Sequence, residues 1–226
     1  MKETGMLFNG AMVRALLDGR KTQTRRIVKG QEFWGDAAIN ARPIDGGLWR
    51  IEGATQINPW LLDNSVTFVD VKSPFGQVGD RIWVRETFAL SVIDPDGGPP
   101  EDAPENYDVI YREGDQPDGG WTDSAGNKIS APWKPSLHMP RWASRITLEI
   151  TDVRIERLHD ISEADSIAEG IELTLRGWKS TKYEHVFYTL PVMAFQDLWE
   201  STGGDWNANP WVWVIEFKQI KTGAAA

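Results

Sequence analysis

A lysine, a threonine and a distant glutamate are the residues of this chain whose types could support acid–base chemistry. Lys21 and Thr24 lie close together, directly after a segment with the pattern of a short helix. An amine that loses its charge on burial can take the proton of a nearby hydroxyl and activate it as a nucleophile. The same two residues also fit an ordinary surface strand, in which they would point to opposite faces.

Glu169 is the third candidate, because it is expected in the last turn of a helix that ends at Gly170. The helix dipole disfavours a negative charge there by about 0.3–1 kcal/mol, so this carboxylate should seek a cation. Beside Lys21 it would form a coupled acid–base pair that transfers protons near neutral pH. On this ground alone Glu169 also fits an exposed carboxylate at a helix end.

The composition excludes several classes of chemistry. The 226 residues contain no cysteine, which rules out disulfides, thiolate metal sites, iron–sulfur clusters and a cysteine nucleophile. The three histidines show no ligand spacing, and neither a phosphate-binding loop nor a Gly-x-Ser-x-Gly elbow occurs. We therefore predict no metal and no organic cofactor. With no secretion signal and no long apolar run, we expect a soluble, cytoplasmic protein without a membrane partner.

Basic residues concentrate between positions 14 and 29, where six cations accompany one acid and give a local charge of +5. Such a strip predicts a surface that attracts anionic or electron-rich ligands, although a solvated charged face has the same composition. The whole chain has a net charge of −9. That excess of acid argues against a general nucleic-acid coat and leaves room only for a short RNA.

Hydrophobic periodicity predicts three short helices in this sequence. The first spans Asn9 to Asp18, with Asn9 as its cap and Gly19 at its end. The second starts at Ser162 and should bury an apolar stripe made of Ala164, Ile167, Ala168 and Ile171. The third starts at Pro191 and presents Val192, Phe195, Leu198 and Trp199.

Alternating patterns predict strands at 81–88, near 107–112, at 142–158 and at 211–218. The apolar parity of the third strand changes after Asp152, which predicts a bulge at Thr151–Asp152. Two stretches rich in glycine and proline, at about 30–72 and 89–135, are interpreted as insertions, the first with two strands. Together these elements predict one α+β domain over 1–226, a mixed β-barrel with a few short helices at its ends and long loop insertions.

Four segments, spread over nearly the whole chain, are informative in their order and placement: 17–26 (LDGRKTQTRR), 78–84 (VGDRIWV), 168–170 (AEG) and 213–218 (WVIEFK). In this order they resemble the ASCH domain family of the PUA-like β-barrel superfamily. Residues 133–145 further resemble the larger phage and prophage members of that family. The resemblance implies a PUA-like (ASCH) barrel.

One branch of this family, a small bacterial N(4)-acetylcytidine amidohydrolase, has a proposed triad of a lysine, a threonine and a helical glutamate. The resemblance places Lys21, Thr24 and Glu169 in those roles and implies removal of acyl groups from the exocyclic N4 of cytidine. In the favoured scheme, Lys21 takes the proton of Thr24, which attacks the acyl carbonyl, while Glu169 orients Lys21. In a second scheme Glu169 or Lys21 activates water. This chain is much longer than that enzyme, and its insertions could shape a roomier acyl pocket.

Resemblance and polarity together assign further residues to the pyrimidine ring, ribose or carbonyl: Arg26, Arg85, Glu86 and His138. The expected partner is a small nucleoside or nucleobase. An RNA-binding protein or a ribonuclease of the same family is the alternative, because PUA-like barrels commonly hold RNA. A phage assembly or regulatory factor with an inactive site is a third.

Overall fold

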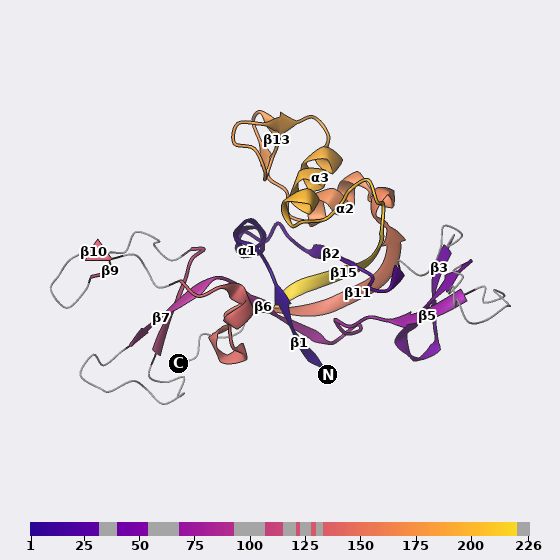
Figure 1. The fold of residues 1–226 in the computed structure, drawn as a ribbon, viewed down its shortest axis with the longest axis horizontal. Coiled ribbons are helices and arrows are strands. Elements are labelled where there is room, and N and C mark those ends of the chain that lie inside the picture. The colour runs from indigo at the N-terminus through magenta and orange to yellow at the C-terminus, as the bar shows by residue number, and fades with distance from the viewer. Residues whose placement is uncertain are drawn as a thin grey trace.

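A five-stranded sheet forms the centre of the computed structural model, which describes residues 1–31, 40–53, 68–92, 107–114, 121–122, 128–129 and 133–220. Its strands, in spatial order, are β1 (Glu3–Leu7), β6 (Arg81–Arg85), β11 (Thr147–Arg157), β15 (Trp211–Ile220) and β2 (Gln23–Ile27). β1 and β6 are parallel, and the other neighbouring pairs are antiparallel (Figure 1).

The sheet is open, which corrects the predicted barrel, whereas the mixed α+β class with few helices is confirmed. Within the described ranges β1 and β2 are the two edges, and each pairs with one neighbour. A side chain links these edges. The Arg26 guanidinium donates to the Leu7 carbonyl at 2.6 Å and lies over the Phe8 ring. In a closed barrel, β1 and β2 would instead be joined by a ladder of backbone hydrogen bonds.

The predicted first helix is confirmed as α1 (Gly10–Leu17), which connects the two edge strands. The Asn9 side chain accepts a hydrogen bond from the Met12 backbone N–H at 2.9 Å and so caps the helix. Gly19 follows in the left-handed conformation, with φ of 71°. Helix α1 therefore ends abruptly and directs the next residues toward β2.

The predicted bulge is also confirmed. β11 pairs with β15 along its length, and the register shifts between Ile150 and Asp152. Beyond the shift, three charged residues at alternate positions share one face of the strand: Asp152, Arg154 and Glu156. The strand begins at Thr147, later than predicted, because Trp142 belongs to a short 3-10 turn, Arg141–Ala143.

Two helices and a small sheet cover the same side of the central sheet (Figure 1). They are α2 (Glu163–Ala168), α3 (Pro191–Ser201) and the strands β12 (Leu173–Thr174), β13 (Gly177–Lys179) and β14 (Phe187–Tyr188). Helix α3 matches its prediction: Pro191 lies in its first turn, and Phe195, Leu198 and Trp199 are buried.

The predicted apolar stripe of α2 is wrong at Ala164 and Ile167, whereas Ile171, just after the helix, is buried as predicted. Ala164 and Ile167 are exposed, and the helix instead buries Ser166 and its capping residue, Glu169. The reason is the surface that α2 contacts, because the nearest strand, β2, presents polar and charged side chains on that side. Helix α2 consequently turns its polar side inward.

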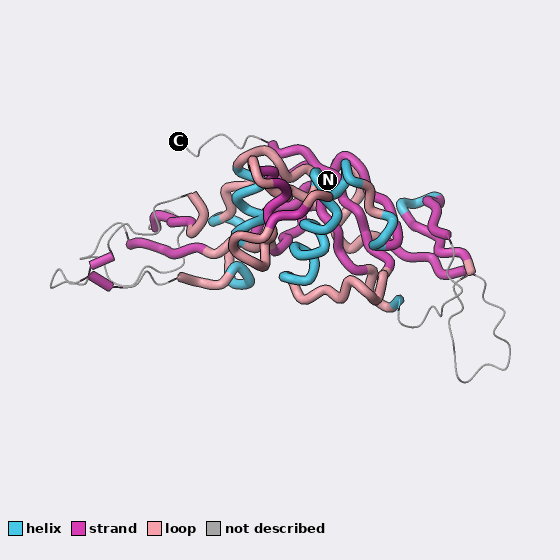
Figure 2. The backbone as a smooth tube through the Cα atoms, turned by 90° about the horizontal axis from the view of Figure 1, so that it is seen from above, coloured by secondary structure: helices cyan, strands magenta, loops and turns pink. Residues whose placement is uncertain are grey.

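The two insertions lie at opposite ends of the molecule (Figures 1 and 2). The first forms a three-stranded antiparallel sheet rather than the two strands predicted: β3 (Asn40–Ile44), β4 (Leu48–Glu52) and β5 (Phe68–Lys72). The second contains the pair β7 (Phe88–Val92) and β8 (Tyr107–Tyr111), and the pair β9 (Trp121–Thr122) and β10 (Lys128–Ile129). Six stretches of the insertions lie outside the described residues: 32–39, 54–67, 93–106, 115–120, 123–127 and 130–132.

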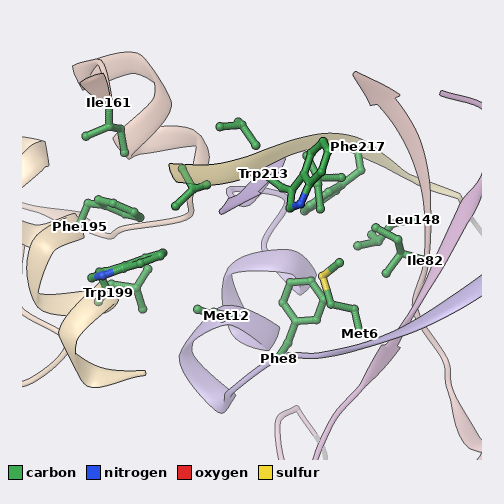
Figure 3. Close-up of a cluster of buried hydrophobic side chains, with 14 of the residues drawn as sticks. Met6, Phe8, Met12, Ile82, Leu148, Ile161, Phe195, Trp199, Trp213 and Phe217 are labelled. Atoms are coloured by element: carbon green, nitrogen blue, oxygen red, sulfur yellow. The ribbon is translucent and has the colours of Figure 1, made fainter. Parts of the chain in front are cut away.

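One large cluster of buried apolar side chains joins the sheet to α1 and α3 (Figure 3). Met12 of α1 packs in it together with Trp213 and Phe217 of β15 and with Phe195 and Trp199 of α3. A smaller cluster lies around Phe88, Met139 and Ala143. None of the helices in the described part of the chain has the length and apolar character needed to cross a bilayer.

Gly170 lets the end of α2 pack directly against Ala15 and Lys21, because it has no Cβ. Its φ is 92°, and a Cβ there would lie 2.7 Å from the Ala15 Cβ and 2.8 Å from the Lys21 Cβ. Gly19, with φ of 71°, is a matched control, because a Cβ added there would meet nothing within 4 Å.

We predict that Gly19→Ala lowers the free energy of unfolding by about 1–2 kcal/mol, the cost of a left-handed residue. Gly170→Ala should lower it further, because Lys21 or α1 must also move. Urea denaturation of both variants measures the difference. Equal losses would show that the contact with Lys21 is not tight.

Candidate active site

Lys21 and Glu169 form an ion pair that is shielded from solvent. The Lys21 Nζ donates to Glu169 Oε2 at 2.7 Å and to the Glu169 backbone carbonyl at 2.8 Å. The two side chains are 0% and 3% exposed. The cation expected for a carboxylate at a helix C-terminus is therefore Lys21.

The residues around Lys21 hold it against the last turn of α2. The Thr22 backbone N–H donates to the Ala168 carbonyl at 2.9 Å, and the Arg20 guanidinium donates to the Gly170 carbonyl at 2.6 Å. Carbonyls in a last helical turn lack partners within the helix, so these bonds satisfy groups that would otherwise be unpaired. The segments 17–26 and 168–170, far apart in sequence, thus form one structural unit.

Burial lowers the pKa of Lys21 below the ordinary lysine value. The negative charge and hydrogen bond of Glu169 oppose this shift, while the positive charges of Arg26 and Arg25 add to it. Burial also lowers the pKa of Arg26. A lysine with a lowered pKa has a larger neutral fraction near neutral pH, and the neutral amine is the form that can act as a base.

Arg25 holds the other oxygen of Glu169. Its guanidinium lies 3.3 Å from Glu169 Oε1, 3.3 Å from Glu156 and 3.4 Å from Asp165, and its side chain is 0% exposed. Arg25 also donates to the side chain of Gln23, its neighbour on the same face of β2. Glu169 is consequently held from two sides, by Lys21 at Oε2 and by Arg25 at Oε1.

Arg154 extends this network across β11. Its guanidinium contacts four carboxylates, those of Asp152, Glu156, Asp165 and Glu216. Burial alone would lower the pKa of Arg154, but the hydrogen bonds and charges of these carboxylates raise it. Burial likewise favours the neutral form of Asp165, and the pKa of Asp165 is nevertheless lowered by its hydrogen bonds and by the two arginines.

Thr24, the third predicted catalytic residue, is also buried, at 1% exposed. It lies opposite Ile215 in the β2–β15 ladder and alternates with Gln23 and Arg25, which face the ion network. Among the hydrogen bonds of the described residues, none joins the Thr24 hydroxyl to Lys21 or Glu169. The structure therefore brings two of the three predicted residues into direct contact.

Glu169 lines two cavities, which also share Met12 and Leu198 as lining residues. One cavity, of about 400 Å³, we call the polar pocket. It is lined mainly by charged and hydroxyl-bearing residues of α1 and 169–184. The other, of about 480 Å³, we call the aromatic pocket. Its walls include Phe75, Phe195 and Trp199, and Figure 3 shows the last two on α3 facing the Met12 side of the core.

Of the four predicted substrate-binding residues, only Arg26 lines one of these pockets. Arg85 donates to the Leu137 carbonyl, and its guanidinium lies over the Trp83 ring. Glu86 is buried and pairs with Arg145 at 2.9 Å. His138 is exposed in a 3-10 turn. The structure does not bring these three residues to Lys21 and Glu169.

The basic strip between positions 14 and 29 is not the continuous surface that its composition predicts. Lys21 and Arg25 are buried within ion pairs. Arg14 pairs with Glu113, and Arg20 pairs with Asp18. Acids, most of them distant in the sequence, neutralise much of this strip, which weakens the expectation that it attracts a short RNA.

Sequence reasoning missed Arg25, Arg154 and Gln23, which organise the carboxylates. A usable signal was present in β11, where the charged residues at 152, 154 and 156 alternate with apolar ones. Such spacing places them on one strand face, which must then be covered by polar partners. β2 gives no such signal, because Ile27 is its one apolar residue. In the described part of the chain no three His, Asp or Glu residues are arranged to hold a metal ion.

No protein-family model, curated protein or solved structure matches this chain. The ASCH resemblance therefore rests on the sequence motifs. What the structure adds is the contact between two of those motifs, at Lys21 and Glu169.

We predict that Arg25→Met lowers the free energy of unfolding by about 3–5 kcal/mol, because it leaves buried carboxylates short of a partner. Arg42→Met is the matched control, since it removes an exposed ion pair with Glu52 and should have little effect. Chemical denaturation compares the two variants. Similar small effects would show that the buried network contributes little to stability.

Proposed function

We propose that this protein is an amidohydrolase that removes acyl groups from the exocyclic N4 of cytidine derivatives. The observation that carries the proposal is the buried Lys21–Glu169 pair, whose glutamate lines two ligand-sized pockets. Its support from sequence is the resemblance to the ASCH family, in which a lysine and a glutamate occupy the matching motif positions.

In one route Glu169, which lines both pockets, activates water. The Glu169 carboxylate takes a proton from water, and the oxygen adds to the acyl carbonyl carbon. The tetrahedral intermediate then breaks its C–N bond, and N4 leaves with the proton that Glu169 returns. Lys21 holds the carboxylate in place and exchanges protons with it. The products are the free carboxylic acid and the cytidine amine.

In the other route Lys21, as a neutral amine, takes the proton of Thr24, and the Thr24 oxygen attacks the acyl carbon. The C–N bond then breaks, N4 leaves with the proton that Lys21 holds, and an acyl ester remains on Thr24. Water hydrolyses this ester, which releases the acid and restores the Thr24 hydroxyl. The water route is favoured by the lining of the pockets, because Glu169 lines both and Thr24 lines neither among the described residues.

We predict that the purified protein hydrolyses N(4)-acetylcytidine and that Lys21→Ala and Glu169→Ala each lower kcat by about 10²–10⁴-fold. Lys218→Ala removes an exposed lysine, 64% accessible, and is the control. Chromatographic detection of cytidine measures the rates. Absence of hydrolysis by the folded wild-type protein would refute the proposed function.

Mass spectrometry of the acid-quenched reaction separates the two routes. The water route predicts no acyl group on Thr24 and a Thr24→Ala variant that keeps part of its activity. An acetyl group on Thr24, with Thr24→Ala as inactive as Lys21→Ala, would establish the threonine as nucleophile.

We predict that kcat rises with pH and reaches its plateau below the ordinary pKa of lysine. In both routes the neutral form of Lys21 accepts a proton, from Thr24 or from Glu169, and the pKa of Lys21 is lowered. Glu169 opposes that lowering, so Glu169→Gln should move the rising limb of the residual activity to lower pH. A pH–rate profile of both proteins measures the shift. A limb at the same or higher pH in the variant would contradict this coupling.

A further inference from the structure

The two pockets that Glu169 lines differ in chemistry. The polar pocket offers charged and hydroxyl side chains, among them Lys179, Glu172 and Tyr183. The aromatic pocket offers mostly carbon, from Phe75, Phe195, Leu198, Trp199, Met12 and Ile27, with Arg26 and Lys29 at its side. Glu169 therefore stands between a hydrophilic and a hydrophobic compartment.

A substrate whose reacting bond lies at Glu169 can place one half in each of the two pockets that this residue lines. An N4-acylcytidine has a matching division, because its ribose is hydrophilic and its acyl chain is hydrophobic, and the amide bond joins the two halves. Hydroxyl groups are satisfied by charged and polar side chains, whereas a hydrocarbon group gains free energy by leaving water for an apolar surface.

We infer that the aromatic pocket is the acyl site, that the polar pocket holds the cytidine, and that the protein prefers large or aromatic acyl groups to acetyl. This inference rests on the proposed function. The aromatic pocket, at about 480 Å³, lies within the range of pockets that hold whole small molecules, roughly 300–1,000 Å³. An acetyl group leaves most of that apolar surface uncovered, and a benzoyl group covers much more of it.

The acyl site comes from α3, the end of β2 and the turn that holds Phe75. None of its lining residues belongs to the insertions at 30–72 and 89–135. Within the described residues, the roomier pocket expected from the insertions is thus built by the central part of the fold.

The test compares kcat/KM for N(4)-acetylcytidine and N(4)-benzoylcytidine in the wild type and in variants. Phe75→Ala removes a half-buried ring from the acyl site. We expect it to lower the benzoyl value by about tenfold and the acetyl value much less, as for the loss of apolar contact in a specificity pocket. Phe68→Ala is the matched control, because that ring is 42% exposed on β5 and lines neither pocket.

Two further variants complete the experiment. Ile27→Ala alters the same pocket at a residue that is 47% exposed, so it tests the inference if Phe75→Ala fails to fold. Tyr183→Ala alters the polar pocket and should lower kcat/KM for both substrates by the same factor.

The outcomes separate the inference from the proposed function. Selective loss of benzoyl hydrolysis in Phe75→Ala or Ile27→Ala supports the acyl site. If the wild type hydrolyses both substrates, and these variants lose no more kcat/KM for the benzoyl substrate than Phe68→Ala does, the acyl site is overturned. The proposed function is then kept. A selective loss of benzoyl hydrolysis in Tyr183→Ala also overturns the inference, because it would place the acyl group in the polar pocket. No hydrolysis of either substrate by the wild type overturns both.

Discussion

The contact of the Lys21 ammonium with Glu169, away from solvent, is the constraint on which the rest of this site depends. Taking two charges out of water costs several kcal/mol per ion, and the cost is offset only when each charge finds good partners. Lys21 meets two oxygens of Glu169, and the second carboxylate oxygen meets Arg25. The fold must therefore place the end of α2 against the segment before β2 with a precision of about tenths of an ångström.

Several local features of the chain serve that approach. Gly170 removes the Cβ that would meet Lys21, and Gly19 ends α1 so that the chain turns toward α2. The bulge in β11 directs alternate charged residues to the side of the sheet that α2 covers. Helix α2 then buries Ser166 and Glu169, because a polar strand face needs polar partners. The Lys21–Glu169 pair and the network that supports it are parts of one packing arrangement.

The sequence allowed prediction of features that local chemistry determines. The cap at Asn9, the parity change after Asp152 and the proline that starts α3 each act within a few residues, and each was confirmed. Features that depend on distant partners were not predictable in this way. Arg25 lies 144 residues from Glu169, so its burial could not be inferred from its neighbours, and the basic strip was interpreted as a surface. Resemblance and polarity also grouped Arg85, Glu86 and His138 with a site that they do not line.

The most direct test of the central claim is the protonation equilibrium of the Lys21 amine. A heteronuclear NMR titration that follows the Lys21 Nζ measures it without any substrate. The account predicts a midpoint below that of free lysine, and a higher midpoint in Arg26→Gln, because the Arg26 charge helps to lower the pKa of Lys21. A wild-type midpoint at or above that of free lysine would contradict the account, since Lys21 would then remain a protonated structural cation.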